Sequence, residues 1–298
     1  MSRLRLATRS SPLALAQANF VGSLLREKGH EVSLVPVTTS GDTNDAAPLS
    51  QIGGQGIFTV EVQRAVLRGD ADVAVHSAKD LPSVTPDGIL LACVPDRRDP
   101  ADVLVGRSLA GLGPGATVAT GSPRRRSLLL ERRPDLTIVE LRGNMATRLA
   151  KAGRDGIDAV VAAAAALERL GLTNQVAERL EPSWFVPQVG QGALALEAGE
   201  MDVDTLEALH SIDNHEWSTC VRAERAFLRE LGVGCSVPVG AYATLRGALI
   251  ELSGIMASLD GSTVLRATLQ GENAEALGTK LAMTLRDEMG GAELSGWR

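Results

Sequence analysis

The stretch D-V-A-V-H-S-A-K-D-L-P, residues 72–82, decides how the rest of this sequence is interpreted. Val73 to Val75 is a short branched apolar run, which is typical of a fully buried strand. Four polar residues follow it within five positions: His76, Ser77, Lys79 and Asp80. Ligands of open α/β sheets bind beyond the carboxyl ends of the strands, so the sequence predicts a functional site here. Asp80 can transfer a proton or stabilise a developing cation, whereas a solvated turn is the alternative for an isolated Lys–Asp pair.

Length and composition limit the class of protein. A chain of 298 residues is too long for one ordinary core, so two or three domains are expected. The net charge of −6 argues against a general binder of nucleic acid or membrane surfaces. The three cysteines are widely spaced, without metal-type pairing, and no metal site is expected. The longest apolar run, residues 159–167, is too short to span a bilayer, and the start of the sequence lacks a signal-peptide core. The sequence therefore predicts a cytoplasmic protein.

Alternating strands and helices are expected before residue 95. Leu4 to Ala7 reads as a strand, and Ser11 and Pro12 then form the N-cap and first position of a helix. The next segments read in turn as a strand, a helix and a strand: 32–37, 58–67 and 89–94. Residues 38–56 show no period of either kind, which is typical of a lid, a binding loop or a disordered segment. Pro95 to Pro100 reads as a hinge between domains.

The following segment repeats the first in outline. V-A-T-G-S-P at 118–123 opens a helix as L-A-T-R-S-S-P at 6–12 does, and D-A-V-V at 158–161 echoes D-V-A-V at 72–75. We therefore expect two similar βα lobes, with the lid and Asp80 in the first only. Chance similarity is the alternative, because motifs of this length are weak.

Basic residues are concentrated in the second lobe. Between Thr120 and Arg154, nine Lys and Arg stand against three Asp and Glu, a local +6, so the remainder carries −12. Arginine forks suit carboxylates and phosphates, and helix N-termini attract anions. A nucleic-acid groove would need aromatic stacking platforms, and the chain has one Tyr and four Phe. The pattern indicates a small, multiply anionic substrate, although a solvated charged face is the usual reason for such a run.

The remaining sequence indicates a return to the first lobe and then a small α+β unit. A-L-A-L-E at 193–197 reads as the returning strand. Two helices, three strands and a last helix are expected at 204–209, 216–231, 237–244, 248–257, 263–269 and 274–289. Cys93 and Cys220 have the surroundings of core cysteines. Cys235 lies among glycines in G-V-G-C-S-V-P-V-G, where a loop thiol can serve as a nucleophile or an attachment point, or can be without a role.

Together these motifs resemble the porphobilinogen deaminase (hydroxymethylbilane synthase) family along essentially the whole chain. The order and spacing of the motifs are specific even where single motifs are weak. They are A-T-R-S-S-P-L-A-L-A-Q at 7–17, I-G-G-Q-G-I-F at 52–58, A-V-H-S-A-K-D-L-P at 74–82, E-R-R-P-D-L at 131–136, L-R-G-N at 141–144, R-L-G-L at 169–172, V-G-Q-G-A at 189–193, A-E-R-A-F-L at 223–228 and G-C-S-V-P-V-G at 234–240.

The resemblance implies an enzyme, a transferase of tetrapyrrole and heme biosynthesis. Such an enzyme polymerises four porphobilinogen molecules head to tail, releasing ammonia, into the linear tetrapyrrole hydroxymethylbilane. It builds the product on a covalent dipyrromethane cofactor, and the cysteine that holds this cofactor matches Cys235. The family's catalytic aspartate matches Asp80, with Lys79 beside it. The roles implied for Asp80 are protonating the departing amine, stabilising the cationic azafulvene-like intermediate and holding pyrrole N–H groups.

The resemblance also implies the binding residues. Further cofactor-binding positions match Ser122, Arg124 and Arg125, together with Lys79 and Asp80. Substrate-binding positions match Arg9, Ser11, Phe58, Arg142, Arg148, Arg169 and Gln191. Gln51 and Gln55 depart from the family, because many relatives carry lysines there. T-G-S-P-R-R at 120–125 replaces T-S-S-L-R-R, which puts the start of the helix that presents Arg124 in question.

The expected fold class is α/β, with two periplasmic-binding-protein-like lobes and a small C-terminal α+β domain. Lobe one is expected at 1–95 with 193–212, lobe two at 100–188 and the C-terminal domain at 215–298. A monomer with porphobilinogen as its substrate, and no nucleic-acid or membrane partner, is expected. The alternative is a non-catalytic two-lobed protein that binds small anions.

Overall fold

The computed structural model describes residues 2–38, 59–234, 237–295 and 297. The chain separates into two compact units, Met1–Arg97 with Ala193–Ser218 and Arg98–Gly192 with Thr219–Arg298. It first passes from one unit to the other between Arg97 and Arg98, inside the predicted hinge. The first unit holds the segments predicted for lobe one. The second unit holds lobe two and all of the predicted C-terminal domain except residues 215–218, and the separation of these two domains from each other stays a prediction.

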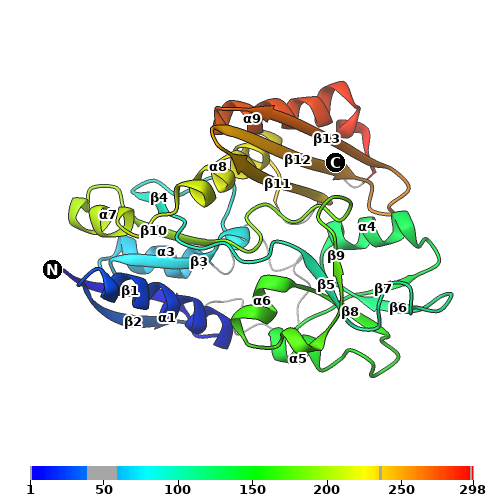
Figure 1. Cartoon of the computed structure of the whole chain (residues 1–298), viewed down its shortest axis with the longest axis horizontal. Coiled ribbons are helices and arrows are strands. Elements are labelled where there is room, and N and C mark those ends of the chain that lie inside the picture. The colour runs from blue at the N-terminus through cyan, green and yellow to red at the C-terminus, as the bar shows by residue number, and fades with distance from the viewer. Residues whose placement is uncertain (1, 39–58, 235–236, 296, 298) are drawn as a thin grey trace. The chain divides into compact units, whose positions relative to one another are not determined.

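The first unit is built on a five-stranded mixed sheet. Its strands are β1 (Arg3–Arg9), β2 (Glu31–Val37), β3 (Val73–Ser77), β4 (Ile89–Cys93) and β10 (Leu194–Gly199). The order is β2-β1-β3-β10-β4, with β1 parallel to β2 and β3, and β10 antiparallel to both neighbours. The returning strand predicted at 193–197 therefore lies between β3 and β4. In Figure 1, β1 and β2 are blue, β3 is cyan and the returning strand β10 is yellow-green.

Alternating residues of this sheet bury opposite faces. Leu6 and Val75 pack with residues of α1 (Pro12–Glu27) and α7 (Val203–His210). Ala7 and Ala74, on the other face, pack with Val62 of α3 (Val60–Leu67). Both faces of β3 are therefore buried, as its continuous apolar run predicts.

The first helix begins as the sequence predicts. Ser11 has an extended backbone, and its Oγ accepts a hydrogen bond from the N–H of Ala14 at 3.3 Å, while Pro12 takes the first helical position. The cap holds the N-terminus of α1 directly after the carboxyl end of β1.

The second unit repeats this arrangement in its own five-stranded sheet. The strands are β5 (Asp102–Gly106), β6 (Thr117–Ala119), β7 (Thr137–Val139), β8 (Ala159–Ala163) and β9 (Val176–Leu180). The order is β7-β6-β8-β5-β9, again with three parallel strands followed by antiparallel pairs. Helix α4 (Pro123–Arg132) starts with Ser122 as its cap and Pro123 first, so the departure at Pro123 leaves a well-formed helix start. The predicted pair of similar lobes is confirmed.

An antiparallel sheet with helices on it completes the second unit. Strands β11 (Val239–Arg246), β12 (Leu249–Ala257) and β13 (Val264–Gly271) pair in that order. Buried residues of α8 (His215–Leu231) and α9 (Ala274–Met283) form one core with them. Beyond α9 a π-helical turn, Thr284–Glu288, continues the helix predicted to end at 289. The remaining short elements are α5 (Met145–Leu149), α6 (Ala164–Arg169), and the 3-10 turns at Ala78–Asp80, Thr173–Gln175 and Gly291–Glu293.

Helices α8 and α9 approach each other closely at Gly278. A Cβ atom there would overlap the carbonyl oxygen of Ala223 and would lie 2.7 Å from the backbone nitrogen of Phe227. We expect Gly278→Ala to lower the free energy of unfolding by about 1–3 kcal/mol, because the helices must move apart. Urea unfolding measures this change. Gly113→Ala is the matched control, since no atom lies within 4 Å of its Cβ position. Equal midpoints for the two variants would contradict the expectation.

No helix among the residues that the structure describes combines the length and the apolar character that crossing a membrane requires.

Candidate active site

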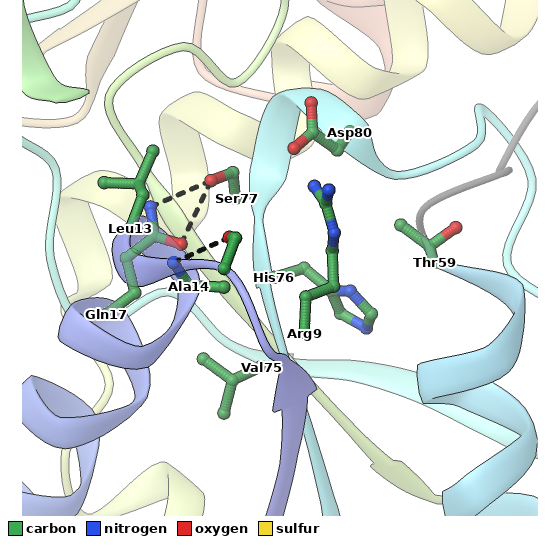
Figure 2. Close-up of a pocket in the computed structure, with 10 residues that line it drawn as sticks. Arg9, Leu13, Ala14, Gln17, Thr59, Val75, His76, Ser77 and Asp80 are labelled. Atoms are coloured by element: carbon green, nitrogen blue, oxygen red, sulfur yellow. Dashed lines mark hydrogen bonds between the residues drawn. The ribbon is translucent and has the colours of Figure 1, made fainter. Parts of the chain in front are cut away.

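A small cavity of about 50 Å³ lies at the carboxyl ends of β1 and β3 in the first unit (Figure 2). The residues that line it are Arg9, Ser11, Leu13, Ala14, Gln17, Thr59, Val75, His76, Ser77 and Asp80. Five of these were singled out in the sequence: Arg9, Ser11, His76, Ser77 and Asp80. The cavity lies where the strand-end rule for α/β sheets predicts a ligand site.

The parallel pairing of β1 and β3 brings these residues together. Leu6 lies opposite Val73 and Ala7 opposite Ala74, so both strands end at the same edge of the sheet. Arg9 is the last residue of β1, and the 3-10 turn Ala78–Asp80 directly follows β3. Residues about 70 positions apart in the sequence thus meet in one cavity.

Hydrogen bonds fix the wall of the cavity on the side of α1. The amide of Gln17 donates to the Ser77 Oγ at 2.9 Å, and the Ser77 hydroxyl donates to the Gln17 Oε1 at 3.2 Å. The buried hydroxyl of Thr8 donates to the carbonyl oxygen of Ala14 at 3.2 Å. The ends of β3 and β1 are therefore both tied to α1, through Gln17 and Ala14, before any ligand binds.

Asp80 is the acidic residue of this lining, and Arg9 contributes the guanidinium group. Figure 2 shows the Arg9 side chain pointing toward the Asp80 carboxylate, with the His76 ring beside the base of Arg9. A carboxylate in a cavity can accept hydrogen bonds from N–H groups, stabilise a cation and exchange a proton. The guanidinium group is suited to a ligand carboxylate.

In the second unit, Arg124 and Arg125 share one buried carboxylate. Asp102, fully buried on β5, accepts a hydrogen bond from Arg124 Nη2 at 2.7 Å and from Arg125 Nε and Nη2 at 2.9 and 2.6 Å. Gln191 also donates to Asp102, at 3.0 Å. Burial raises the pKa of the Asp102 carboxyl, but the charges of the two arginines outweigh burial and lower it to about 2. Asp102 is therefore a charged anchor for both arginines.

The other predicted second-lobe residues take local partners. Ser122 caps α4 through the N–H of Arg125. Arg142 forms an ion pair with the exposed carboxylate of Glu140 at 2.7 Å. Arg148 Nε donates to the carbonyl oxygen of Gly143 at 2.7 Å, and Arg169 Nη2 donates to that of Gly192 at 2.8 Å. Each arginine is thus anchored within its own unit.

Several predicted residues lie outside the described residues: Phe58, Cys235, and the lid positions 39–56 with Gln51 and Gln55. Cys93 and Cys220 are buried, as expected for core cysteines. Burial, together with the neighbouring Asp213, raises the pKa of the Cys93 thiol and keeps it protonated.

Sequence reasoning did not find Asp102. It lies in the unremarkable stretch D-P-A-D-V-L, and its partners are 22, 23 and 89 positions away. Its only local signal is a carboxylate beside an apolar strand, which is common at strand ends.

A carboxylate and a guanidinium group line one strand-end cavity, and further arginines lie at the corresponding edge of the second lobe; both features are suited to an α/β enzyme that acts on anionic small molecules. Two family models match the chain: the dipyrromethane cofactor binding domain of porphobilinogen deaminase over residues 4–207, and the C-terminal domain of the same enzyme over 218–287. The chain belongs to the porphobilinogen deaminase family.

Full-length relatives agree with the family models. The porphobilinogen deaminase of Syntrophotalea carbinolica is 46% identical over 95% of this chain and 92% of its own. That of Pelobacter propionicus is 44% identical over 98% of this chain and 96% of its own. That of Geobacter sulfurreducens is 42% identical over 99% and 94%. The resemblance noted in the sequence is therefore confirmed.

Solved structures of binding proteins show a weaker likeness. The methionine binding protein MetQ is 14% identical, with a TM-score of 0.45 over 70% of this chain and 89% of its own. The periplasmic aliphatic sulphonate binding protein SsuA from Escherichia coli is 16% identical, with a TM-score of 0.41 over 76% and 70%. The strand order in the two sheets, rather than these likenesses, carries the two-lobed description.

Proposed function

We propose that the cavity at the end of β3 is where this chain carries out the reaction of its family, with Asp80 as the catalytic residue. That reaction joins four porphobilinogen molecules head to tail into hydroxymethylbilane and releases ammonia. The observation that carries the proposal is the presence of the Asp80 carboxylate and the Arg9 guanidinium group in one cavity.

The chemistry of porphobilinogen matches these two groups. The aminomethyl nitrogen is protonated, so when its C–N bond breaks the electron pair leaves with the nitrogen as ammonia and positive charge develops on the pyrrole. The Asp80 carboxylate can stabilise that charge and accept a hydrogen bond from the pyrrole N–H. The new C–C bond takes its electrons from the second ring, whose carbon then loses a proton. The Asp80 carboxylate can accept this proton and then release it to the free ammonia or to water, which restores the carboxylate for the next unit.

The described residues fit the dipyrromethane cofactor. A dipyrromethane has pyrrole N–H groups and carboxylate side chains, and the cavity offers the Asp80 carboxylate, the Arg9 guanidinium group and the hydroxyls of Ser11 and Ser77. When bound, the cofactor supplies the ring carbon from which the product grows. Cys235 is the proposed point of attachment.

Arg124 and Arg125, both proposed as cofactor-binding residues, differ in how much of each side chain a ligand can reach. The Arg124 side chain is 3% exposed and that of Arg125 is 11% exposed. Arg125 is therefore the better candidate for direct contact, and Arg124 for supporting it. Lys79 and Ser122 complete the proposed cofactor positions.

Arg9, Ser11, Arg142, Arg148, Arg169, Gln191 and Phe58 are the proposed substrate-binding residues. Arg142 and Arg148 support this role because they lie within the local +6 segment, Arg142 just before the short helix α5 and Arg148 in its last turn. The Gln191 amide donates hydrogen bonds to Asp102 and to the carbonyl oxygen of Pro100. Its proposed contribution is therefore to hold Asp102, which anchors the two arginines.

We expect Arg142→Ala and Arg148→Ala to accumulate partly extended enzyme forms, because the carboxylates of the growing chain lose their binding partners. Arg→Lys should restore function only in part, since lysine cannot form a bidentate fork. Intact-mass spectrometry after limiting substrate measures the distribution. Arg107→Ala, which removes an exposed arginine from the same unit, is the control. A normal distribution and full activity in both alanine variants would contradict this role.

The decisive test of the proposed function is product formation from porphobilinogen together with intact mass. The enzyme should carry a covalent dipyrromethane, turn pink with acidic aldehyde reagent and release ammonia as hydroxymethylbilane forms. A protein that only binds small anions shows none of these. We also propose that the protein acts as a monomer in the cytoplasm. Size-exclusion chromatography with light scattering measures its molar mass and so tests the oligomeric state.

A further inference from the structure

Glu197 is a buried carboxylate directly behind the wall of the cavity. It lies on β10, and its side chain is fully buried. In the antiparallel register, Ala195 is opposite His76 and Glu197 is opposite Ala74. His76 and Glu197 are therefore diagonal neighbours on one face of the sheet.

Two side chains meet the same oxygen of Glu197. The His76 Nε2 lies 3.1 Å from Oε2, and the amide of Gln63, on α3, donates a hydrogen bond to Oε2 at 2.8 Å. The His76 side chain is 3% exposed. A buried carboxylate is costly unless it is both hydrogen-bonded and matched by a cation. Gln63 supplies only a hydrogen bond, whereas a protonated imidazole supplies the charge.

His76 belongs both to the pair with Glu197 and to the lining of the cavity. Its side chain lies against Glu197 and also lines the cavity that Arg9 and Asp80 share. An imidazolium backed by a carboxylate forms a dipole whose positive end lies at the wall and whose negative end lies in the core. The wall then presents two positive groups, Arg9 and His76, to a substrate with two carboxylates.

We propose that Glu197 is a positioning residue that acts through His76: with Gln63 it holds a protonated imidazole at the cavity wall as a second cationic element for the substrate. This rests on the proposed function of the cavity. Because the wall contacts the substrate before and during the reaction alike, its loss should raise KM more than it lowers kcat.

The test compares Glu197→Gln, His76→Gln and the double variant in the cofactor-loaded enzyme. Glu197→Gln keeps the shape and the hydrogen-bonding capacity but removes the charge. We expect it to raise KM for porphobilinogen about tenfold, in line with the strength of a hydrogen bond to a charged group, and to change kcat by less than about threefold. The double variant should raise KM no further than the single variants do, because the two residues act as a unit.

A spectroscopic readout is independent of turnover. The chain has four histidines, so ¹⁵N-histidine labelling gives few imidazole signals, and those lost in His76→Gln belong to His76. The signals should be those of a doubly protonated ring in the unaltered protein and of a neutral ring in Glu197→Gln. Should His76→Gln fail to fold, the signals that change in Glu197→Gln identify His76 instead.

Asp72→Asn is the matched control. Asp72 pairs with Arg5 at 2.6 Å before the start of β3, so this change removes a paired carboxylate from the opposite end of the same sheet. Its KM should be unchanged. A neutral His76 ring in the unaltered protein, or a KM change below threefold in folded Glu197→Gln, overturns the inference. Absence of product from the unaltered enzyme counts against the proposed function instead, while the nitrogen signals still decide the state of His76.

Discussion

Replacing Asp80 with asparagine is expected to lower kcat by about 10²–10⁴-fold, the usual contribution of a positioned acid or base. The amide has the shape of the carboxylate and can still accept a hydrogen bond from a pyrrole N–H. It cannot balance a positive charge or take up a proton. Asp80 is half-buried at the end of a short turn, so the fold and the covalent cofactor should be retained.

Turnover per cofactor-loaded molecule is the quantity to measure, with intact mass establishing the loading. Asp87→Asn serves as the control, because Asp87 is an exposed aspartate in the loop that follows in the same unit. It should leave kcat unchanged. Near-normal kcat in fully loaded Asp80→Asn would remove Asp80 from the catalytic role.

We expect Asp102→Ala to lower the free energy of unfolding more than any other substitution considered above. Arg124 and Arg125 would remain buried without their common counter-charge, and breaking a buried ion pair in this way costs about 3–5 kcal/mol. Urea unfolding of the holoenzyme, followed by a probe in the second unit such as Trp184, measures the change. Asp135→Ala removes an exposed partner of Arg133 and should have a much smaller effect. Equal unfolding midpoints in the two variants would show that Asp102 is not the anchor.

The pH dependence of stability gives a second measure of the same anchor. The pKa of Asp102 is lowered to about 2 in the folded protein, against about 3.9 in an unfolded chain. A lowered pKa means that the stabilisation is complete above about pH 4 and is lost as the pH falls toward 2. Asp102→Asn should therefore reduce the fall in unfolding free energy between pH 5 and pH 3. Parallel curves for Asp102→Asn and the unaltered protein would contradict this assignment.

Local signals made much of the fold predictable. Ser11 with Pro12, and Ser122 with Pro123, marked the starts of the helices that follow β1 and β6, because cap and proline chemistry act within a few residues. The apolar run of β3 marked the strand that leads to Asp80. The cavity residues at the end of β3 followed from the strand-end rule, whereas Arg9 and Ser11 followed from the resemblance to the family.

Other features depend on contacts between distant residues and had no local signal. The apolar run at 159–167 divides into β8 and α6 after Ala163, where no capping side chain marks the change. Strand β7 has three residues, too few for a period to be recognised. Glu197 read as the polar end of a strand, and only the pairing of β10 with β3 brings it to His76.

The position of β10 has a consequence for the order of synthesis. A ribosome releases residues 1–97 well before 194–199, yet β10 lies between β3 and β4 and is the strand with which β4 pairs in the described sheet. A nascent chain that ends before β10 therefore leaves one edge of β3 open and β4 without its partner strand, which is the kind of edge that recruits other chains. The sheet of the first unit closes only after the lobe-two sequence, 98–192, has been made. The His76–Glu197 pair is thus among the last contacts that translation allows in the first unit, and ribosomes that stall inside lobe two carry an incomplete sheet.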